Sequence, residues 1–382
     1  MLGKVTKVLV LHWFPLEQFP PAQNLLNVLG SESGVAVACC TTRKQQDYKL
    51  FTNDSIRIKR SVFPSRETNI FFRVLRFLLF PWLCLWTVLW NRPDVLIYYE
   101  PHSAPAAWLC LLLNPRCRLM IHYHEYREPK HFRDRGNSLA RLGHWLEKYW
   151  LFRKARWISH TNHDRIRLFL KDCPEVPESK LHALPNMPPR HWIAKRENDT
   201  HKDPIILRLI YIGAISLHDT YLEPLLTWFK NIRKDNVSLD LFINNIDPAT
   251  EKFLAKENEP GLTIHLGGVP YDQLPSILPK YDIGLILYRC NTINYVYNAP
   301  NKLFEYLMCG LNVIYPQQML GVAPYARSEC SPWVKSIDFE KLSELSVDEL
   351  KRWGGAPKQW EQSCETVYKE LLNTILTLNE QS

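Results

Sequence analysis

The chain has 382 residues, of which 46% are hydrophobic and 12% aromatic. This composition is ample for two globular domains and excludes a disordered or fibrous protein. The net charge of +8 suits an anionic substrate or an anionic membrane, and no nucleic-acid partner is expected because no nucleic-acid-binding module pattern occurs.

The ten cysteines are scattered and form no CxxC pair. Their distribution indicates reduced thiols in the cytoplasm and excludes both a disulfide framework and a zinc site. The first apolar run, "KVLVLHW", is too short for a signal peptide and is not followed by a small-residue cleavage site. We therefore expect a cytoplasmic protein with no export signal.

Short apolar runs alternate with amphipathic segments of helix length, a pattern typical of parallel α/β sheets. The first half predicts strands at 7–13, 35–40, 56–61, 95–99, 118–124 and 157–161. The second half predicts a separate set of strands at 207–213, 239–244, 262–268, 283–288 and 312–316. The predicted fold class is α/β with two Rossmann-like domains.

The domain boundaries follow from composition. A proline-rich and charged stretch between the two sets of strands predicts an N-terminal domain at 1–188 and a linker at 189–204. The C-terminal domain is expected at 205–340, followed by C-terminal helices at 341–382. The amphipathic segment 358–378 needs a partner surface, so we expect the last helix to pack back on the N-terminal domain.

Segment 71–90, "FFRVLRFLLFPWLCLWTVLW", has about the length of a bilayer span. Arg73, Arg76 and Pro81 oppose a spanning helix, and the next strand follows at once. Three tryptophans favour a helix that lies on the inner face of a membrane, although a plain core helix is the alternative; they are Trp82, Trp86 and Trp90.

The stretch "NAPNKLFEYLMCGLNVIYP", residues 298–316, predicts a short helix that leads into a buried strand. Pro300 suits the first turn, so the amides of Asn301 and Lys302 would point out of the helix end and attract an anion. Lys302 adds a full charge, and a solvent-facing Glu305 could accept hydrogen bonds from a ribose diol. In the alternative interpretation Asn298 and Pro300 merely cap the helix, and the two charged side chains are simply solvated.

This stretch resembles the "P-x-K-x-x-E-Y-x-x-x-G-x-P-V-I" signature of GT-B glycosyltransferases, especially the GT4-like group. Residues 209–229 and 264–288 resemble the strands and glycine turns of the same C-terminal domain, and "HALPNM" at 182–187 resembles the end of its N-terminal domain. The resemblance implies two Rossmann-like domains that face each other across a cleft. It also implies a nucleotide-sugar donor and retention of the anomeric configuration.

By this resemblance Glu305 contacts the ribose, Lys302 lies near the donor phosphates, and Gly213 and Ala214 form the loop beneath them. The predicted donor site also includes Tyr288, Asn298, Pro300 and Asn301. Two positions depart from the family pattern. Tyr297 stands where a glutamate often precedes Glu305, and His218 stands alone where many members carry a basic pair.

In the N-terminal half, the predicted strand 118–124 ends in two histidines that share one face, because side chains alternate along a strand. The resemblance matches His124 to an active-site histidine, and we expect His124 and Glu125 to carry catalysis by contacting the transferred sugar or the acceptor hydroxyl. The alternatives are a metal bound by these two residues with His122, and histidines that are only packed in the sheet. Glu100 and His102 are candidates for the acceptor side.

The sequence therefore predicts a glycosyltransferase that moves a sugar from a nucleotide sugar to a glycan or lipid-linked acceptor in cell-envelope polysaccharide synthesis. We expect no metal and no cofactor, because Lys302 and the helix end would balance the charge of the leaving group. A sugar-nucleotide 2-epimerase is the first alternative. A non-catalytic partner subunit is the second, and Tyr297 favours it.

Overall fold

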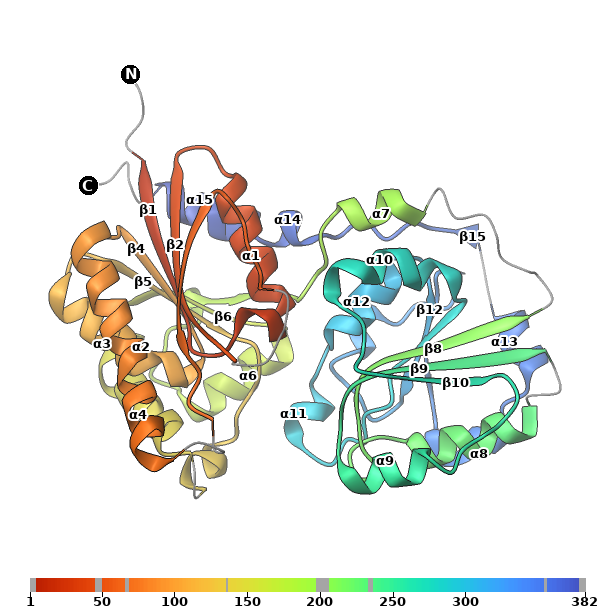
Figure 1. Cartoon of the computed structure of the whole chain (residues 1–382). Helices are drawn as coiled ribbons and strands as arrows, with labels where there is room; N and C mark the ends of the chain where they lie inside the picture. Colours follow the sequence, from red (N-terminus) through yellow and green to blue (C-terminus); the bar gives the residue numbers. More distant parts are fainter. Residues whose placement is uncertain are drawn as a thin grey trace. The chain divides into compact units, whose positions relative to one another are not determined.

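The computed structural model describes residues 5–44, 50–65, 69–134, 137–196, 206–232, 236–353 and 356–377. The chain forms two compact units, shown in Figure 1. The first consists of Met1–Pro185 together with Cys364–Ser382, and the second of Asn186–Ser363. Each unit is built on its own parallel sheet, which confirms the prediction of two α/β domains.

The first unit contains a seven-stranded sheet with the order β3-β2-β1-β4-β5-β6-β7, and every neighbouring pair is parallel. The central strands β1 and β4 are almost continuously apolar because helices cover both faces of the sheet. Leu9 and Leu96 face the core beneath one helical layer, whereas Ile97 and Met120 face the layer that contains α1 and α15. The strands are β1 (Thr6–His12), β2 (Val35–Arg43), β3 (Ile56–Val62), β4 (Val95–Tyr99), β5 (Arg118–Tyr123), β6 (Ala155–His160) and β7 (Leu181–Ala183).

The helices of this unit follow their strands in the usual βα alternation. At the end of the chain, Tyr368 donates a hydrogen bond to the Pro21 carbonyl at 3.2 Å, and Leu371 and Ile375 are buried. The helices are α1 (Pro20–Ser31), α2 (Ile70–Asn91), α3 (Glu100–Leu113), α4 (Ser138–Leu146), the π-helical turn η3 (Glu147–Leu151), α5 (Phe152–Lys154), α6 (His163–Asp172), α14 (Cys364–Val367) and α15 (Lys369–Thr377).

The second unit contains a six-stranded parallel sheet with the order β10-β9-β8-β11-β12-β14. Its strands are β8 (Leu207–Ile215), β9 (Val237–Ile246), β10 (Leu262–Leu266), β11 (Ile283–Leu285), β12 (Asn312–Pro316) and β14 (Val334–Ile337), and a small separate sheet pairs β13 (Cys330–Ser331) with β15 (Ala356–Pro357). Its helices are α7 (His191–Arg196), α8 (Leu222–Ile232), α9 (Pro248–Leu254), α10 (Leu274–Ile277), α11 (Ile293–Val296), α12 (Asn301–Met308) and α13 (Val347–Arg352).

The structure differs from the sequence prediction at several boundaries. The strand predicted at 118–124 ends at Tyr123, so His124 lies just beyond it, and the strand predicted at 283–288 ends at Leu285. The predicted linker 189–204 contains helix α7, and its residues 197–204 lie outside the described residues. Residues 341–363 belong to the second unit because Leu342, Val347 and Leu350 pack in its core.

Candidate functional site

Lys302 lies on the first turn of α12, and its side chain reaches the carboxyl end of β8. The residue is only 7% exposed, and its Nζ lies 4.1 Å from the ring centre of Tyr211 and 4.9 Å from that of Tyr288. Among the described residues, Nζ has no hydrogen-bond partner. Burial lowers the pKa of Lys302 to about 7, although Glu305 opposes this shift. A buried amine held by two aromatic rings and lacking an acceptor is suited to an anionic ligand.

Glu305 follows one turn later on the same helix face. The sequence predicts a solvent-facing carboxylate, and this is wrong, because Glu305 is 7% exposed. The reason is that α12 is enclosed on all sides, with every residue from Lys302 to Met308 buried. Burial raises the pKa of Glu305 to about 7, while Lys302 lowers it. Burial therefore disfavours the charged form of both side chains, and each charge favours the other.

The end of β8 forms the floor of this site. Gly213 has φ +139, and a Cβ atom there would lie 2.8 Å from Lys302 Nζ, so a larger residue would displace the amine. The carbonyl of Ala214 accepts a hydrogen bond from the Tyr211 hydroxyl. Tyr288 stacks on Tyr295 with ring centres 5.1 Å apart. The structure thus brings Gly213, Ala214, Tyr288 and Lys302 together.

The start of α12 also differs in detail from the prediction. Pro300 is the N-cap residue and not a first-turn residue, because the helix begins at Asn301, and the Pro300 carbonyl accepts from the Leu303 amide at 3.0 Å. Asn301 Oδ1 accepts a hydrogen bond from Asn186 Nδ2 at 2.8 Å. Asn298 lies half-buried in the preceding loop. The amides of Asn301 and Lys302, at the first two positions of α12, have no acceptor within the helix.

His218 does not replace the basic pair that many GT4-like sequences carry after the glycine loop. Its side chain is 85% exposed, and Nδ1 donates to Asp219 Oδ1 at 2.8 Å. Asp219 also accepts from Asn291 Nδ2 at 2.9 Å. The buried positive charge at this sheet edge therefore comes from Lys302.

In the first unit, three histidines gather at the carboxyl ends of β1 and β5. The ring centre of His124 lies 5.0 Å from that of His122 and 5.9 Å from that of His12. Burial lowers the pKa of His12 to about 4 and the pKa of His122 to about 3, and it lowers the pKa of His124 as well. All three rings are therefore neutral at physiological pH and act as hydrogen-bond donors or acceptors rather than cations.

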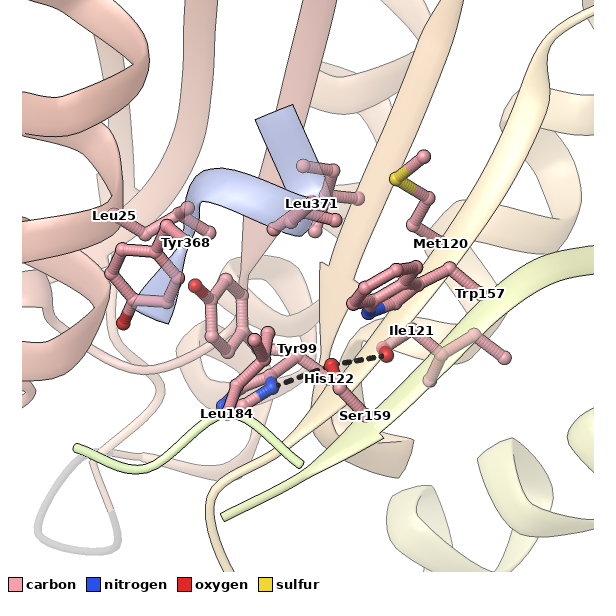
Figure 2. A pocket seen from close by; sticks show the side chains of 11 residues that line it. Leu25, Tyr99, Met120, Ile121, His122, Trp157, Ser159, Leu184, Tyr368 and Leu371 are labelled. Atoms are coloured by element: carbon pink, nitrogen blue, oxygen red, sulfur yellow. Dashed lines mark hydrogen bonds between the residues drawn. The ribbon is translucent and has the colours of Figure 1, made fainter. Parts of the chain in front are cut away.

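The three histidines differ in what they contact. His122 Nδ1 donates to Ser159 Oγ at 2.8 Å, and that hydroxyl donates to the Ile121 carbonyl at 3.2 Å (Figure 2). The cavity beside His122, which Tyr368 and Leu371 help to line, measures about 10 Å³ and is at the lower limit for one water molecule. His122 is therefore a packed core residue.

His124 instead keeps one ring nitrogen unused. Its ring stacks on Tyr99 with centres 4.8 Å apart and on Phe19 at 5.5 Å. Its Nε2 has no hydrogen-bond partner among the described residues, although the residue is 7% exposed. A neutral imidazole nitrogen fixed in this way can bind a hydroxyl group.

The peptide groups of His124 are held from two sides. Glu100 Oε1 accepts from the backbone N–H of His124 at 2.7 Å and from that of Glu125 at 3.2 Å. Arg165 Nη1 donates to the His124 carbonyl at 2.5 Å and to Thr161 Oγ1 at 2.7 Å. Glu100 has φ +61, an unusual backbone conformation that is held only where its surroundings require it. Glu100 therefore positions the loop at His124.

Two opposing effects act on the pKa of the Glu100 carboxyl group. Burial raises its pKa to about 7, opposed by Arg127, whose Nε lies 3.9 Å from Glu100 Oε2. A cavity of about 40 Å³ lies next to Glu100 and His160 and has room for a few water molecules. His102 packs edge-on against Phe14 at 4.8 Å, and burial lowers its pKa to about 3. Glu125 is exposed at the same strand end.

Sequence reasoning missed two residues of these clusters. Arg165 is 2% exposed and donates a hydrogen bond to the His124 carbonyl. In the sequence, however, it has no feature that separates it from other helix residues, three positions after the N-cap Asn162. Tyr211 reads as a core strand residue, although its ring faces Lys302. The metal alternative finds no support, since the described ranges contain no group of three His, Cys, Asp or Glu side chains placed to hold an ion.

No protein-family model matches the sequence, and no curated protein matches it either. Solved structures do match over nearly the whole chain. A lipopolysaccharide outer core galactosyltransferase, WaaB, is 11% identical with a TM-score of 0.57, and the match covers 97% of this chain and 99% of that one. A glycosyltransferase from Rickettsia africae is 9% identical with a TM-score of 0.62, covering 99% and 100%.

A UDP-GlcNAc 2-epimerase from Methanocaldococcus jannaschii is 10% identical with a TM-score of 0.54, covering 96% of this chain and 99% of that one. The chain therefore has the GT-B fold that glycosyltransferases share with these epimerases. At these identities the likeness establishes the fold and leaves the reaction to be argued from the residues.

Proposed function

We propose that the protein is a glycosyltransferase that transfers a sugar from a nucleotide-sugar donor to a glycan or lipid-linked acceptor in cell-envelope polysaccharide synthesis. The observation that carries the proposal is the buried Lys302, whose Nζ has no partner among the described residues and faces Gly213 at the carboxyl edge of a parallel sheet. Ligands of open α/β sheets bind at this edge.

The donor phosphates would bind between Lys302 and the free amides at the start of α12. When the bond from the anomeric carbon to the phosphate oxygen breaks, the leaving diphosphate gains negative charge, which the ammonium and the helix end stabilise. The Glu305 carboxylate would accept hydrogen bonds from the hydroxyl groups of the ribose. We propose that this chemistry needs no metal ion, and that added EDTA leaves transfer unchanged.

On the acceptor side, His124 would bind a hydroxyl of the transferred sugar or of the acceptor through Nε2. The acceptor hydroxyl must lose its proton as its oxygen bonds to the anomeric carbon. The neutral His124 imidazole would orient this hydroxyl by accepting its hydrogen bond, and the proton would pass to an oxygen of the departing diphosphate. Glu125 is exposed at the same strand end and Glu100 holds the loop, so we propose Glu125 as the second catalytic residue and Glu100 as a positioning residue.

The resemblance to GT4-like enzymes supports retention of the anomeric configuration. The exposed apolar residues of α2 support an acceptor at the inner face of a membrane, with the enzyme in the cytoplasm and bound peripherally. A 2-epimerase is the second candidate, because an epimerase is among the solved structures with this fold. An epimerase acts on the nucleotide sugar alone, so an apolar docking surface would serve no purpose in it.

The test begins with a thermal-shift panel of nucleotide sugars. The nucleotide sugar that stabilises the protein most is then incubated with membrane lipid extract, and the products are separated by mass spectrometry and NMR. Transfer requires a free nucleoside diphosphate and a glycosylated acceptor. Recovery of the same nucleotide carrying a sugar changed at C2 would replace the proposal with the epimerase, and binding of no nucleotide would refute both.

A further inference from the structure

Exposed apolar side chains are concentrated on one group of helices in the first unit. Among the described residues, 11 of the 23 exposed large apolar residues lie on α2, where Phe71 is 68% exposed and Trp90 69%. Others lie at the end of α3 and along α4 and η3, including Trp145 at 51% and Trp150 at 56%. The remaining exposed apolar residues of the described chain are scattered singly. An apolar surface of this kind marks an interaction site.

The second part of this surface, on α4 and η3, was not identified from the sequence. Helix α3 packs against both α2 and α4, so the three helices are neighbours (Figure 1). Gly143 permits the contact of α4 with α3, because a Cβ atom there would lie 1.7 Å from the Pro101 carbonyl oxygen. Trp145, Tyr149 and Trp150 follow directly and are all exposed.

We call this surface the apolar–basic face. The name covers the exposed apolar residues of these helices and the basic residues beside them, which are described below. The apolar residues are Ile70, Phe71, Phe72, Val74, Leu75, Leu78, Leu79, Trp82, Trp86, Leu89, Trp90, Leu112, Leu113, Leu142, Trp145, Tyr149 and Trp150.

Helix α2 cannot leave the protein to span a bilayer. By length and composition it is the one helix among the described residues that could cross a membrane. However, Phe80, Cys84 and Val88 are buried in the core of the first unit. The helix also contains Pro81 and ends at Asn91, and its C-cap residue Arg92 has φ +42. One side of α2 therefore belongs to the core, and only the other side is free to contact a membrane.

The exposed charged side chains on these helices have one sign. The only acidic residues on α2, α3, α4, η3 and α5 are Glu100 and Glu147, and both are buried. Exposed basic residues occur on or next to these helices, at Arg92, Arg116, Arg141, Lys148, Arg153 and Lys154. Apolar and aromatic side chains with basic neighbours and no exposed acid complement an anionic lipid surface. A protein partner would not require this one-sided charge.

We propose that the apolar–basic face docks the protein on anionic bilayers, with α2 lying along the interface and the α4–η3 segment as a second contact. The inference extends the proposed function, since a lipid-linked acceptor would meet the enzyme at this face. Docking itself does not depend on glycosyl transfer. Two separate contacts fix the orientation of the first unit on the membrane, which a single helix would not do.

The test measures flotation of the full-length protein with phosphatidylglycerol–phosphatidylcholine vesicles and with pure phosphatidylcholine vesicles. We expect binding at least tenfold stronger to the anionic vesicles at low salt, and release at high salt. The double variant Trp145→Gln/Trp150→Gln should weaken binding at least tenfold. The charge reversal Arg141→Glu/Lys148→Glu should remove the preference for anionic lipid.

A matched control removes exposed apolar residues elsewhere, as Leu50→Gln/Leu266→Gln, and should bind like the wild type. Equal binding of wild type and the Trp145/Trp150 variant would overturn the second contact, and equal binding to both vesicle types would overturn the charge argument. Concentration-dependent dimerisation without vesicle binding would show that a second copy covers the face instead. Thermal shifts with nucleotide sugars on the same samples report folding and donor binding, so a failure of docking is distinguishable from a failure of the proposed function.

Discussion

Replacement of Lys302 by methionine removes one positive charge while keeping a side chain of similar length. The Nζ atom lies 4.1 Å from the ring centre of Tyr211, and an unbranched apolar side chain can occupy the same space. If Lys302 binds a donor phosphate, the variant loses a hydrogen bond to a charged group, worth about 1.5–3 kcal/mol. Nucleotide-sugar affinity should then fall roughly 10- to 100-fold.

The same residue should make donor binding take up a proton. Burial places the pKa of Lys302 at about 7, so at pH 8 the free protein holds it mostly neutral. A bound diphosphate favours the charged form and raises that pKa, so binding of the nucleotide sugar at pH 8 should be accompanied by net proton uptake. The uptake should disappear in Lys302→Met. It should also shrink below pH 7, where the free amine is already charged.

Isothermal titration calorimetry in buffers of different ionisation enthalpy measures this uptake directly. The matched control is Lys252→Met, which removes an exposed lysine from α9 of the same unit and should leave affinity and proton uptake unchanged. Binding of the Lys302 variant within twofold of wild type, or heats independent of buffer at pH 8, would refute the assignment of Lys302 to the donor phosphates.

Three further substitutions test the other parts of the site. Glu305→Gln should weaken nucleotide-sugar binding about tenfold, as measured by calorimetry. Because burial raises the pKa of Glu305 to about 7, wild-type stability should fall as pH rises from 4.5 to 7 by an amount that the variant lacks, and identical melting profiles would contradict this. His124→Ala should cut transfer about 100-fold while nucleotide affinity stays within twofold, and normal turnover would exclude a role in the reaction. Glu100→Gln should lower the rate of transfer about tenfold. Because the pKa of Glu100 is about 7 and only its carboxylate holds the loop strongly, the wild-type rate should rise through pH 7, and the variant should lack this rise. A pH–rate profile that is the same in both proteins would count against the positioning role of Glu100.

The fold could be predicted from the sequence because it depends on local patterns. The apolar runs of β4 and β12 were located to the residue, since strands buried on both faces are continuously apolar and end at polar or turn residues. The short strands β7 and β14 were missed, because their sequences LHA and VKSI contain polar residues and form no apolar run.

The site could be predicted only in part, because burial and partners depend on tertiary packing. Lys302 and Glu305 were located by a motif, but the sequence does not show that an eight-residue helix is enclosed on every side. The same limit applies to Arg165, which contacts His124 from another helix. Trp145 and Tyr149 are four residues apart, the spacing of residues that share a core face of a helix, but α4 packs on α3 with its other side and leaves both exposed.

The most direct test of the central claim is the fate of the nucleotide sugar. The protein is incubated with the nucleotide sugar that stabilises it most and with a membrane lipid extract, and NMR and mass spectrometry follow the sugar. We predict release of a nucleoside diphosphate in step with the appearance of the sugar on an acceptor, with the anomeric configuration retained. Return of an intact nucleotide sugar altered at C2, with no free diphosphate, would contradict glycosyl transfer.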